Sequence, residues 1–188
     1  MTLFVKRTRS EFIIAQIYVD DIVFDSSTQK LVDQFLEQMQ EFKMSMVGEM
    51  NFFLGLQVKQ KDDGIFISQS KYAKNLIKKF DLEKASHKTT PSATHLMVTK
   101  DDARTSVDQT LYRSMIGSLL YLTASRSDIA YAVGFCARYH ASPKESHLLQ
   151  VKRIIKYVCG TPDYGIWYTK DTSSYLVGYC DADWERKR

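Results

Sequence analysis

Two neighbouring carboxylates in an apolar setting are the residues of this sequence best suited to chemistry. Asp20 and Asp21 lie between apolar runs at residues 17–19 and 22–24, with no glycine or asparagine beside them. Two like charges so close together repel each other. A hard divalent cation such as Mg²⁺, which prefers oxygen ligands, would remove that repulsion. Two such ions about 3.5 to 4 Å apart can activate a hydroxyl group and stabilise the leaving group in phosphoryl transfer.

Turn chemistry is the competing interpretation, because aspartate is common wherever a chain reverses direction. Two other Asp-Asp pairs occur in the sequence. Asp62-Asp63 precedes Gly64 in an expected hairpin, where the Asp-Gly step would supply positive φ angles. Residues 101–102 lie in a polar segment, where aspartate hydrogen-bonds to its own backbone. Neither pair has the apolar flanks of residues 20–21, yet residue types alone leave both interpretations open.

The composition excludes several classes of protein. The 188 residues include 26 Lys and Arg against 22 Asp and Glu, giving a net charge of +4, and 44% are hydrophobic. This balance is typical of a globular protein and not of a disordered or collagen-like chain. The longest apolar stretch, residues 12–19, is too short to span a bilayer, and the first ten residues lack a signal-peptide pattern. We therefore expect an intracellular protein without a membrane span. The sequence does not indicate its compartment.

The cysteines and histidines suggest neither a disulfide framework nor a zinc site. Cys136, Cys159 and Cys180 are odd in number and widely spaced, so we expect buried free thiols. The four histidines show no ligand spacing, and the sequence contains neither a glycine-rich nucleotide loop nor a GxSxG motif.

Hydrophobic periodicity predicts an α+β fold. Asp20-Asp21 is expected to form a two-residue turn between two strands, and Ser127 or Asp128 to cap a helix. Residues 82–108 show no sustained period and form the best internal boundary. Strands are expected at residues 3–6, 12–19, 22–24, 52–59, 65–68, 166–169 and 175–179, and helices at 28–42, 72–80, 109–125, 128–141 and 144–158.

Residues 17–24, with Tyr18 two positions before Asp20-Asp21, resemble the YxDD motif of reverse transcriptases from copia-type retrotransposons. Further segments occur in the order of that family, so the resemblance covers nearly the whole chain. Residues 49–58 and 67–72 resemble the primer-grip hairpin and the segment after it, 112–122 the thumb, 147–162 the connecting part, and 178–184 the first strand of the ribonuclease H domain.

The resemblance implies a segment of a Pol polyprotein, with the rest of that polyprotein and an RNA or DNA template-primer as partners. The parent reaction would be RNA- and DNA-templated DNA synthesis with Mg²⁺. By this resemblance, residues 1–81 are the end of the palm with a primer-grip-like hairpin and a following helix, 82–108 a connection, 109–164 a helical thumb and connection region, and 165–188 the start of a ribonuclease H-like domain.

The same resemblance implies roles for individual residues. Asp20 and Asp21 would be catalytic and metal-binding carboxylates, with Tyr18 and Val19 beside the primer end and the incoming nucleotide. The family places another metal-binding aspartate and the fingers upstream, and only seventeen residues precede Tyr18. Because removing one member of a catalytic unit can abolish most of the rate, we expect the chain to be inactive by itself.

Other implied site residues lie farther along the chain. Phe53, Leu54 and Gly55 would hold the primer terminus, whereas periodicity alone favours hairpin core for the first two. Asp181 would be the first metal-binding carboxylate of a ribonuclease H site and is otherwise a polar residue at a strand end. Ribonuclease H chemistry is not expected, because Asp181 lacks its acidic partners. Ser127 stands where the family usually has proline.

A second hypothesis is a noncatalytic nucleic-acid-binding remnant that uses basic helix faces. Lysine-rich faces are usually just solvated, and a pI of about 8.8 is below the range typical of nucleic-acid-binding domains. The residues concerned are Lys71, Lys74, Lys78, Lys79, Lys152, Arg153 and Lys156.

Overall fold

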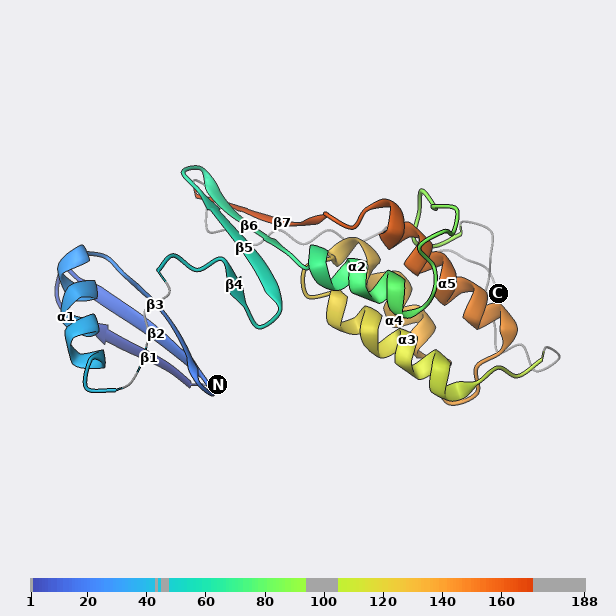
Figure 1. Ribbon diagram of the computed structural model, residues 1–188, viewed down its shortest axis with the longest axis horizontal. Helices are drawn as coiled ribbons and strands as arrows, with labels where there is room; N and C mark the ends of the chain where they lie inside the picture. Colours follow the sequence, from blue (N-terminus) through green and yellow to red (C-terminus); the bar gives the residue numbers. More distant parts are fainter. Residues whose placement is uncertain (1, 43, 45–47, 94–104, 171–188) are drawn as a thin grey trace, which may run out of the picture. The chain divides into compact units, whose positions relative to one another are not determined.

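The computed structural model describes residues 2–42, 44, 48–93 and 105–170 (Figure 1). The chain divides into two compact units, Met1–Met50 and Asn51–Arg188, and each is described by itself. The described residues form two antiparallel sheets and five helices, in agreement with the expected α+β class. The division at Met50 comes before residues 82–108, where the sequence pattern favours a boundary.

The first unit is a three-stranded antiparallel sheet with one helix on it. Its strands are β1 (Thr2–Arg7), β2 (Phe12–Tyr18) and β3 (Asp21–Ser26), in the order β1-β2-β3, and the helix is α1 (Gln29–Met39). Alternate residues point to opposite faces of a strand, so Ile13 and Phe24 lie on the face that α1 covers. The rings of Phe24 and Phe35 are 4.8 Å apart. Phe42, expected on the apolar face of this helix, lies beyond its end and is exposed.

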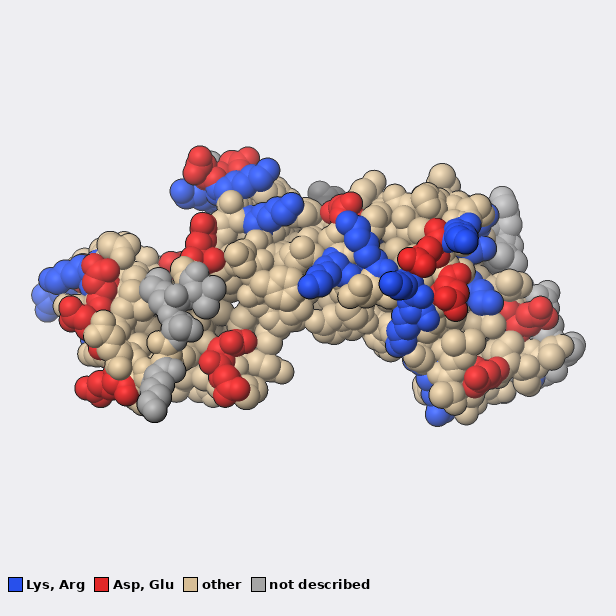
Figure 2. Space-filling model, viewed as in Figure 1, with Lys and Arg blue, Asp and Glu red and all other residues tan. Residues whose placement is uncertain are grey.

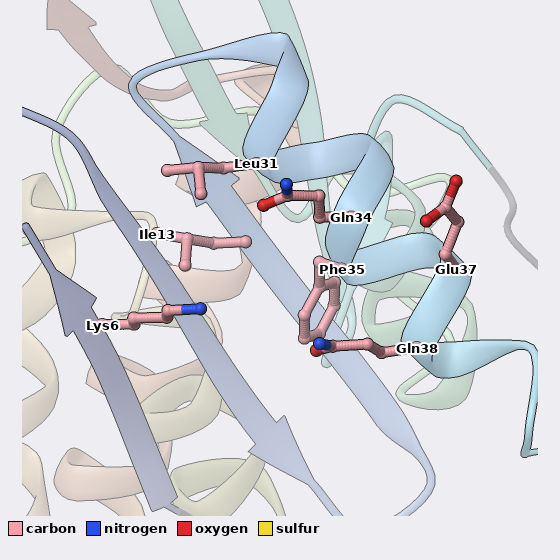
Figure 3. A pocket seen from close by; sticks show the side chains of 7 residues that line it. All are labelled: Lys6, Ile13, Leu31, Gln34, Phe35, Glu37 and Gln38. Atoms are coloured by element: carbon pink, nitrogen blue, oxygen red, sulfur yellow. The ribbon is translucent and has the colours of Figure 1, made fainter.

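A hollow of about 340 Å³ opens between α1 and this sheet (Figure 3). Its apolar floor is formed by Ile13, Leu31 and Phe35. Ile13 pairs with Ser26, at the end of β2 away from Tyr18. The hollow therefore lies at the opposite end of the sheet from Asp20 and Asp21. Its polar lining residues are Lys6, Gln34, Glu37 and Gln38.

The second unit contains a four-stranded antiparallel sheet. Its strands are β4 (Phe52–Phe53), β5 (Leu56–Lys61), β6 (Gly64–Ser68) and β7 (Gly165–Thr169), in that order. The single strand expected over residues 52–59 is wrong, because a turn divides it into β4 and β5. The strand β7, expected to begin a separate ribonuclease H-like sheet, instead pairs with β6. The expected strand at residues 175–179 lies outside the described residues, so the ribonuclease H-like assignment stays a prediction.

The turn between β5 and β6 differs from the expected Asp-Gly turn. Lys61 pairs with Gly64, which leaves Asp62-Asp63 as the two turn residues, and none of the residues 62–64 has a positive φ. Gly64 is needed for close approach instead. A Cβ atom on Gly64 would collide with the backbone oxygen of Tyr168 in β7.

Four helices build the main core of the second unit: α2 (Ser70–Lys79), α3 (Gln109–Leu122), α4 (Ser127–Ala137) and α5 (Glu145–Gly160). All four are expected from the sequence, but α3 and α4 end earlier than predicted. The cap of α4 is Arg126, so the predicted cap at Ser127 or Asp128 is wrong. Side chains from all four helices interlock in one apolar core: Ala73, Leu76 and Ile77; Tyr112, Met115, Ile116, Leu119 and Leu122; Ile129, Ala132, Val133 and Cys136; and Val151, Ile154, Ile155 and Val158.

The described part of the connection, residues 82–93, runs along α5. The backbone N–H of Lys88 donates to the carbonyl oxygen of Lys156 at 3.3 Å. The side chain of Arg153 donates to Thr90 Oγ1 at 2.9 Å. This part of the segment is therefore anchored to the helix, although its sequence shows no period.

Two further expectations concern thiols and membranes. Cys136 is a buried free thiol as predicted, Cys159 is free but only half-buried, and Cys180 lies outside the described residues. Of the helices in the described ranges, none combines the length and apolar character that crossing a membrane requires.

Candidate functional site

The Asp20-Asp21 pair lies at the tip of the β2–β3 hairpin, but the turn is one residue earlier than expected. Tyr18 pairs with Asp21, so Val19 and Asp20 are the two turn residues and Asp21 already belongs to β3. Val19 has a φ of +54° and Asp20 has no positive φ. A positive φ at the first central residue only is the pattern of a type II′ turn, where glycine is the usual residue. A β-branched valine there is strained.

The surroundings of this tip leave both carboxylates in solvent. Because cross-strand partners share a face, Tyr18 and Asp21 lie on the sheet face opposite to α1. Val19 is 80% exposed, and both aspartates are exposed. Neither carboxylate forms a hydrogen bond or ion pair with another described residue. No group of three metal-ligating side chains occurs within the described ranges, so the pair itself is the candidate metal site there.

The predicted primer-holding residues form the second strained turn. Phe53 pairs with Leu56, so Leu54 and Gly55 are the turn between β4 and β5. Both have positive φ, +50° and +81°, which is the pattern of a type I′ turn. Phe53 is half-buried and Leu54 is exposed. The expectation of a simple hairpin core therefore fails for Leu54, whose side chain stands at the tip.

A tyrosine from a distant helix supports this turn. Tyr121 on α3 donates its hydroxyl hydrogen to the carbonyl oxygen of Leu54 at 2.8 Å. A Cβ atom on Gly55 would collide with the same hydroxyl oxygen. The ring of Tyr121 also meets the ring of Tyr72 edge-on at 4.7 Å. The α3 helix therefore holds the β4–β5 turn in place, and only glycine fits at residue 55.

The buried Gln69 completes the link between α2 and α3. Its amide nitrogen donates to the backbone oxygen of Tyr121 at 3.2 Å, and its amide oxygen accepts from the hydroxyl of Ser125 at 2.8 Å. Gln69 and Tyr121 lie in the segments 67–72 and 112–122 that resemble the family, but the sequence assigns neither of them this supporting role. The contacts join residues more than fifty positions apart, which no local pattern reveals.

A buried arginine forms the second group of residues that the sequence does not reveal. Arg126, 2% exposed, donates to both carboxylate oxygens of Asp128 at 2.9 and 2.8 Å. It also donates to the backbone and side-chain oxygens of Thr161 at 2.7 and 2.8 Å. Tyr157 donates to Asp128 at 2.8 Å, and the guanidinium lies 5.3 Å from the ring centroid of Tyr164.

This group has a clear electrostatic effect on Asp128. Burial alone would raise the pKa of Asp128, but hydrogen bonds from Arg126 and Tyr157 and the guanidinium charge outweigh burial and lower it. The same arrangement raises the pKa of Tyr157, mainly through burial and then through its bond to Asp128. The hydrogen bonds of the group join its own members, which is the behaviour of a structural support.

The basic residues predicted on helix faces differ in how exposed they are. Lys71, Lys74, Lys78 and Lys79 of α2 are exposed, and Figure 2 shows blue side chains over this helix. The basic residues of α5 (Lys152, Arg153 and Lys156) are half-buried. Lys74 forms an ion pair with Asp163 at 3.0 Å. The predicted ribonuclease H residue Asp181 lies outside the described residues.

Comparison with known proteins gives consistent matches. The profile of the family described as reverse transcriptase (RNA-dependent DNA polymerase) matches residues 1–94. The retrovirus-related Pol polyprotein from transposon RE1 of Arabidopsis thaliana is 34% identical over 184 residues, which is 97% of this chain and 13% of that protein. The corresponding polyprotein from transposon TNT 1-94 of Nicotiana tabacum is 30% identical, over 96% of this chain and 14% of its own length.

A shorter relative is matched over most of its length. An uncharacterised mitochondrial protein of Arabidopsis thaliana is 34% identical over 170 residues, which is 89% of this chain and 70% of that protein. By contrast, this chain spans only 13% and 14% of the two Pol polyproteins. No solved structure matches the chain.

Proposed function

Because the chain belongs to the reverse transcriptase family of copia-type retrotransposon Pol polyproteins, we propose that Asp20 and Asp21 are metal-binding carboxylates of its polymerase palm. The observation that carries the proposal is the exposed pair at a strained hairpin tip. Residues in rare backbone conformations persist where function requires them. Two exposed, adjacent carboxylate groups match the oxygen ligands that Mg²⁺ prefers.

The substrate of the parent enzyme would be a nucleic-acid template-primer. Tyr18 flanks the carboxylates on the sheet face opposite to α1, and Val19 stands out at the turn, so both are available to meet the primer end and the incoming nucleotide. The Leu54-Gly55 turn presents backbone groups that Tyr121 holds in position. We assign to this turn the role of gripping the primer terminus.

The remaining regions take their roles from the family. Helices α3 to α5 would be thumb and connection. Residues 165–188 would lead into the ribonuclease H-like part, with β7 itself pairing with β6 in the sheet of the second unit. The chain would work as part of a larger Pol polyprotein. Of the catalytic carboxylates of the palm, the family pattern identifies Asp20 and Asp21 in the described residues, and loss of one member of a catalytic unit can remove most of the rate. We therefore propose that the isolated chain has no measurable polymerase activity.

Metal binding tests the carboxylate assignment directly. Mn²⁺ binding, measured by electron paramagnetic resonance, should be detectable at millimolar concentration in the native chain and lost in the Asp20→Asn/Asp21→Asn variant. Asp62→Asn/Asp63→Asn is a matched control, because that pair also lies in a two-residue hairpin turn. Equal loss of binding in both variants would show that any aspartate pair in a turn suffices, which contradicts the proposal.

Primer extension tests the proposed inactivity. The purified 188-residue chain should give no extension of an annealed primer with Mg²⁺ or Mn²⁺. Template-dependent extension that disappears in the Asp20→Asn variant would show that the chain is a complete polymerase, contrary to this proposal.

A further inference from the structure

We propose that Thr90 is a phosphorylation site and that Arg153 of α5 would hold its phosphate group, which would fasten residues 82–93 more tightly to that helix. The phosphoryl donor would be ATP, and the partner would be a protein kinase that selects serine or threonine followed by proline. Thr90 and Arg153 belong to the second unit. The proposal is therefore independent of the aspartate pair in the first unit.

Each proline of the chain follows a residue with a hydroxyl group. The three steps are Thr90-Pro91, Ser142-Pro143 and Thr161-Pro162. Proline holds the residue before it in an extended backbone conformation, which is the conformation in which a kinase binds its substrate segment. The sequence therefore contains three candidate sites for a kinase of this class, and their surroundings distinguish them.

The Ser142-Pro143 step is closed to a kinase. Ser142 is exposed, but Pro143 is buried, and its carbonyl oxygen accepts a hydrogen bond from the backbone N–H of Val107 at 3.2 Å. A kinase that reads the proline must contact its ring, and the ring of a buried proline is not accessible. This step is therefore excluded.

The Thr161-Pro162 step belongs to the group around the buried arginine. Thr161 is half-buried, and its hydroxyl donates to the backbone oxygen of Tyr157 at 2.9 Å and accepts from Arg126 at 2.8 Å. The same guanidinium binds the carboxylate of Asp128. A phosphate on Thr161 would bring a second anion against Asp128, and like charges repel each other. This position is therefore unsuited to phosphorylation.

Thr90 differs from both, because it is exposed and its side chain already contacts an arginine. The Thr90 hydroxyl oxygen accepts a hydrogen bond from Nη2 of Arg153 at 2.9 Å, and the hydroxyl donates to the backbone oxygen of Ser92 at 2.9 Å. The residue lies in an irregular segment outside the helices and strands. Nε of Arg153 is buried and has no hydrogen-bond partner among the described residues. One donor beside Thr90 therefore lacks an acceptor there.

Arg126 shows how the same donors bind an anion. Nε and Nη2 lie on one edge of a guanidinium group and form two parallel donors. In Arg126 these atoms donate to the two carboxylate oxygens of Asp128 at 2.9 and 2.8 Å. In Arg153 the same edge meets a single oxygen, that of Thr90. A phosphate on Thr90 would add three acceptor oxygens and a charge of about −1.5 to −2 at pH 7, so each donor would have an oxygen.

The reaction exchanges one hydrogen bond of Thr90 for stronger ones. The Thr90 oxygen attacks the γ-phosphorus of ATP, the bond to ADP breaks as the new O–P bond forms, and the hydroxyl proton passes to the base of the kinase. The bond to the Ser92 carbonyl is lost with that proton. Bonds from Arg153 to the phosphate replace it, and charge-assisted bonds are about twice as strong as neutral ones. They would reinforce the existing bond from Lys88 N–H to the Lys156 carbonyl.

Phosphorylation of the purified full chain with ATP and a proline-directed kinase is the first test. Mass spectrometry should locate one phosphoryl group on Thr90, and the Thr90→Ala variant should lose it. Ser142→Ala is the matched control, because it removes an exposed hydroxyl that also precedes a proline, and it should leave incorporation unchanged. Incorporation that persists in Thr90→Ala would overturn the proposal, as would a native chain that accepts no phosphoryl group.

Hydrogen exchange of the Lys88 backbone amide, followed by NMR, measures how firmly the segment is held. In the chain phosphorylated at Thr90 this exchange should be about tenfold slower, which is the effect of one charge-assisted hydrogen bond. Arg153→Lys keeps the charge but removes the paired donors, so the phosphorylated variant should lose most of the slowing. Lys152→Gln is the matched control, because adjacent residues of a helix do not share a face, and it should keep the slowing.

Phosphorus NMR reports the contact with the guanidinium directly. The second pKa of a phosphorylated side chain is about 6, and a neighbouring positive charge lowers it. The pKa should therefore be lower in the folded chain than in urea, and Arg153→Gln should remove most of this difference. The other titratable side chains within three residues of Thr90 or Arg153 are basic, and Arg153→Gln leaves them in place: His87, Lys88, Lys152 and Lys156.

Two results would contradict the role of Arg153. One is equal slowing of exchange in the phosphorylated native chain and in phosphorylated Arg153→Lys. The other is a phosphate pKa that is the same in the folded chain and in urea. Helical circular dichroism shows whether each variant is folded. The phosphate titration of the native chain needs no substitution, so the proposal stays testable if a variant of Arg153 unfolds.

Discussion

The contact between Tyr121 and the β4–β5 turn makes a quantitative prediction about Gly55. In a Gly55→Ala variant the residue must keep a φ of +81°, which destabilises an L-residue by about 1 to 2 kcal/mol. The new Cβ atom would also collide with the Tyr121 hydroxyl oxygen, so the tyrosine must move and its hydrogen bond to Leu54 is lost. That bond contributes about 1 kcal/mol. Gly55→Ala should therefore lower the free energy of unfolding by about 2 to 3 kcal/mol.

A double-mutant cycle separates the two causes. Tyr121→Phe alone should lower the free energy of unfolding by about 1 kcal/mol, because it removes the hydrogen bond and leaves the ring contact with Tyr72. In the Tyr121→Phe background the hydroxyl is already absent, so Gly55→Ala should add only the backbone term of about 1 to 2 kcal/mol. The two substitutions should thus be less than additive by about 1 kcal/mol.

Urea unfolding of the full chain measures these differences. Far-ultraviolet circular dichroism reports the helices, and Trp167 fluorescence in the Trp184→Phe background reports the sheet of the same unit. Gly117→Ala is the matched control, since a Cβ atom at that position on α3 meets nothing within 4 Å. It should stabilise the helix by about 0.5 to 1 kcal/mol. Full additivity of Gly55→Ala and Tyr121→Phe would refute the steric explanation.

Further predictions concern the buried arginine, a helix start and a thiol. Asp128→Asn should lower the free energy of unfolding by about 2 kcal/mol, because Arg126 would lose its counter-charge. The 34% exposure of the Asp128 side chain moderates this effect. A change below about 0.5 kcal/mol in urea unfolding would contradict the prediction. Since the pKa of Asp128 is lowered in the folded chain, its contribution to stability is present above the unfolded pKa and is lost as pH falls through the folded value; Asp128→Asn should flatten the acid limb of a pH–stability curve. Ser127→Pro, at the first position of α4, should raise the melting temperature, because proline suits that position and restricts the unfolded chain by about 0.5 to 1 kcal/mol; a lower melting temperature would refute the fit. Burial raises the pKa of Cys136 to about 12, so its thiol should react with Ellman's reagent only after unfolding, whereas fast reaction in the folded chain would mean that the α4 core opens.

Sequence periodicity locates the elements because each has one apolar face. The positions of Leu76, Ile77 and Phe80 predict α2, and those of Leu148, Val151 and Ile155 predict α5. Which residues occupy a turn is harder to predict from the sequence. Acidic residues favour turns, so the sequence points to Asp20-Asp21, but cross-strand pairing in the sheet places Val19 in the turn in spite of its side chain. The register of the β2–β3 pairing outweighs the turn preference of the individual residues.

The contacts that shape the candidate site are beyond sequence reasoning for a different reason. Tyr121 and Leu54 are 67 positions apart, and Arg126 and Thr161 are 35 positions apart. No periodicity links such residues. The pairing of β7 with β6 also joins strands separated by the four helices, which is why residues 165–169 look like the start of a new sheet in the sequence.

Backbone strain supports the assignment of the two hairpin tips more specifically than exposure does. Among the described residues, three that are not glycine have a positive φ: Val19, Leu54 and Asp81. Asp81 is explained by its place after α2. Leu82 N–H donates to the carbonyl oxygen of Ile77 at 3.1 Å and Asp81 N–H to that of Lys78 at 3.1 Å, which is the usual Schellman end of a helix.

No helix end accounts for the other two. Val19 and Leu54 occupy two-residue hairpin turns that glycine or asparagine would form with less strain. A β-branched or bulky residue with positive φ is uncommon, and such residues cluster at functional sites. These are also the turns that the family resemblance marks as the carboxylate tip and the primer grip. The strain and the family pattern are independent observations, and both select the same two turns.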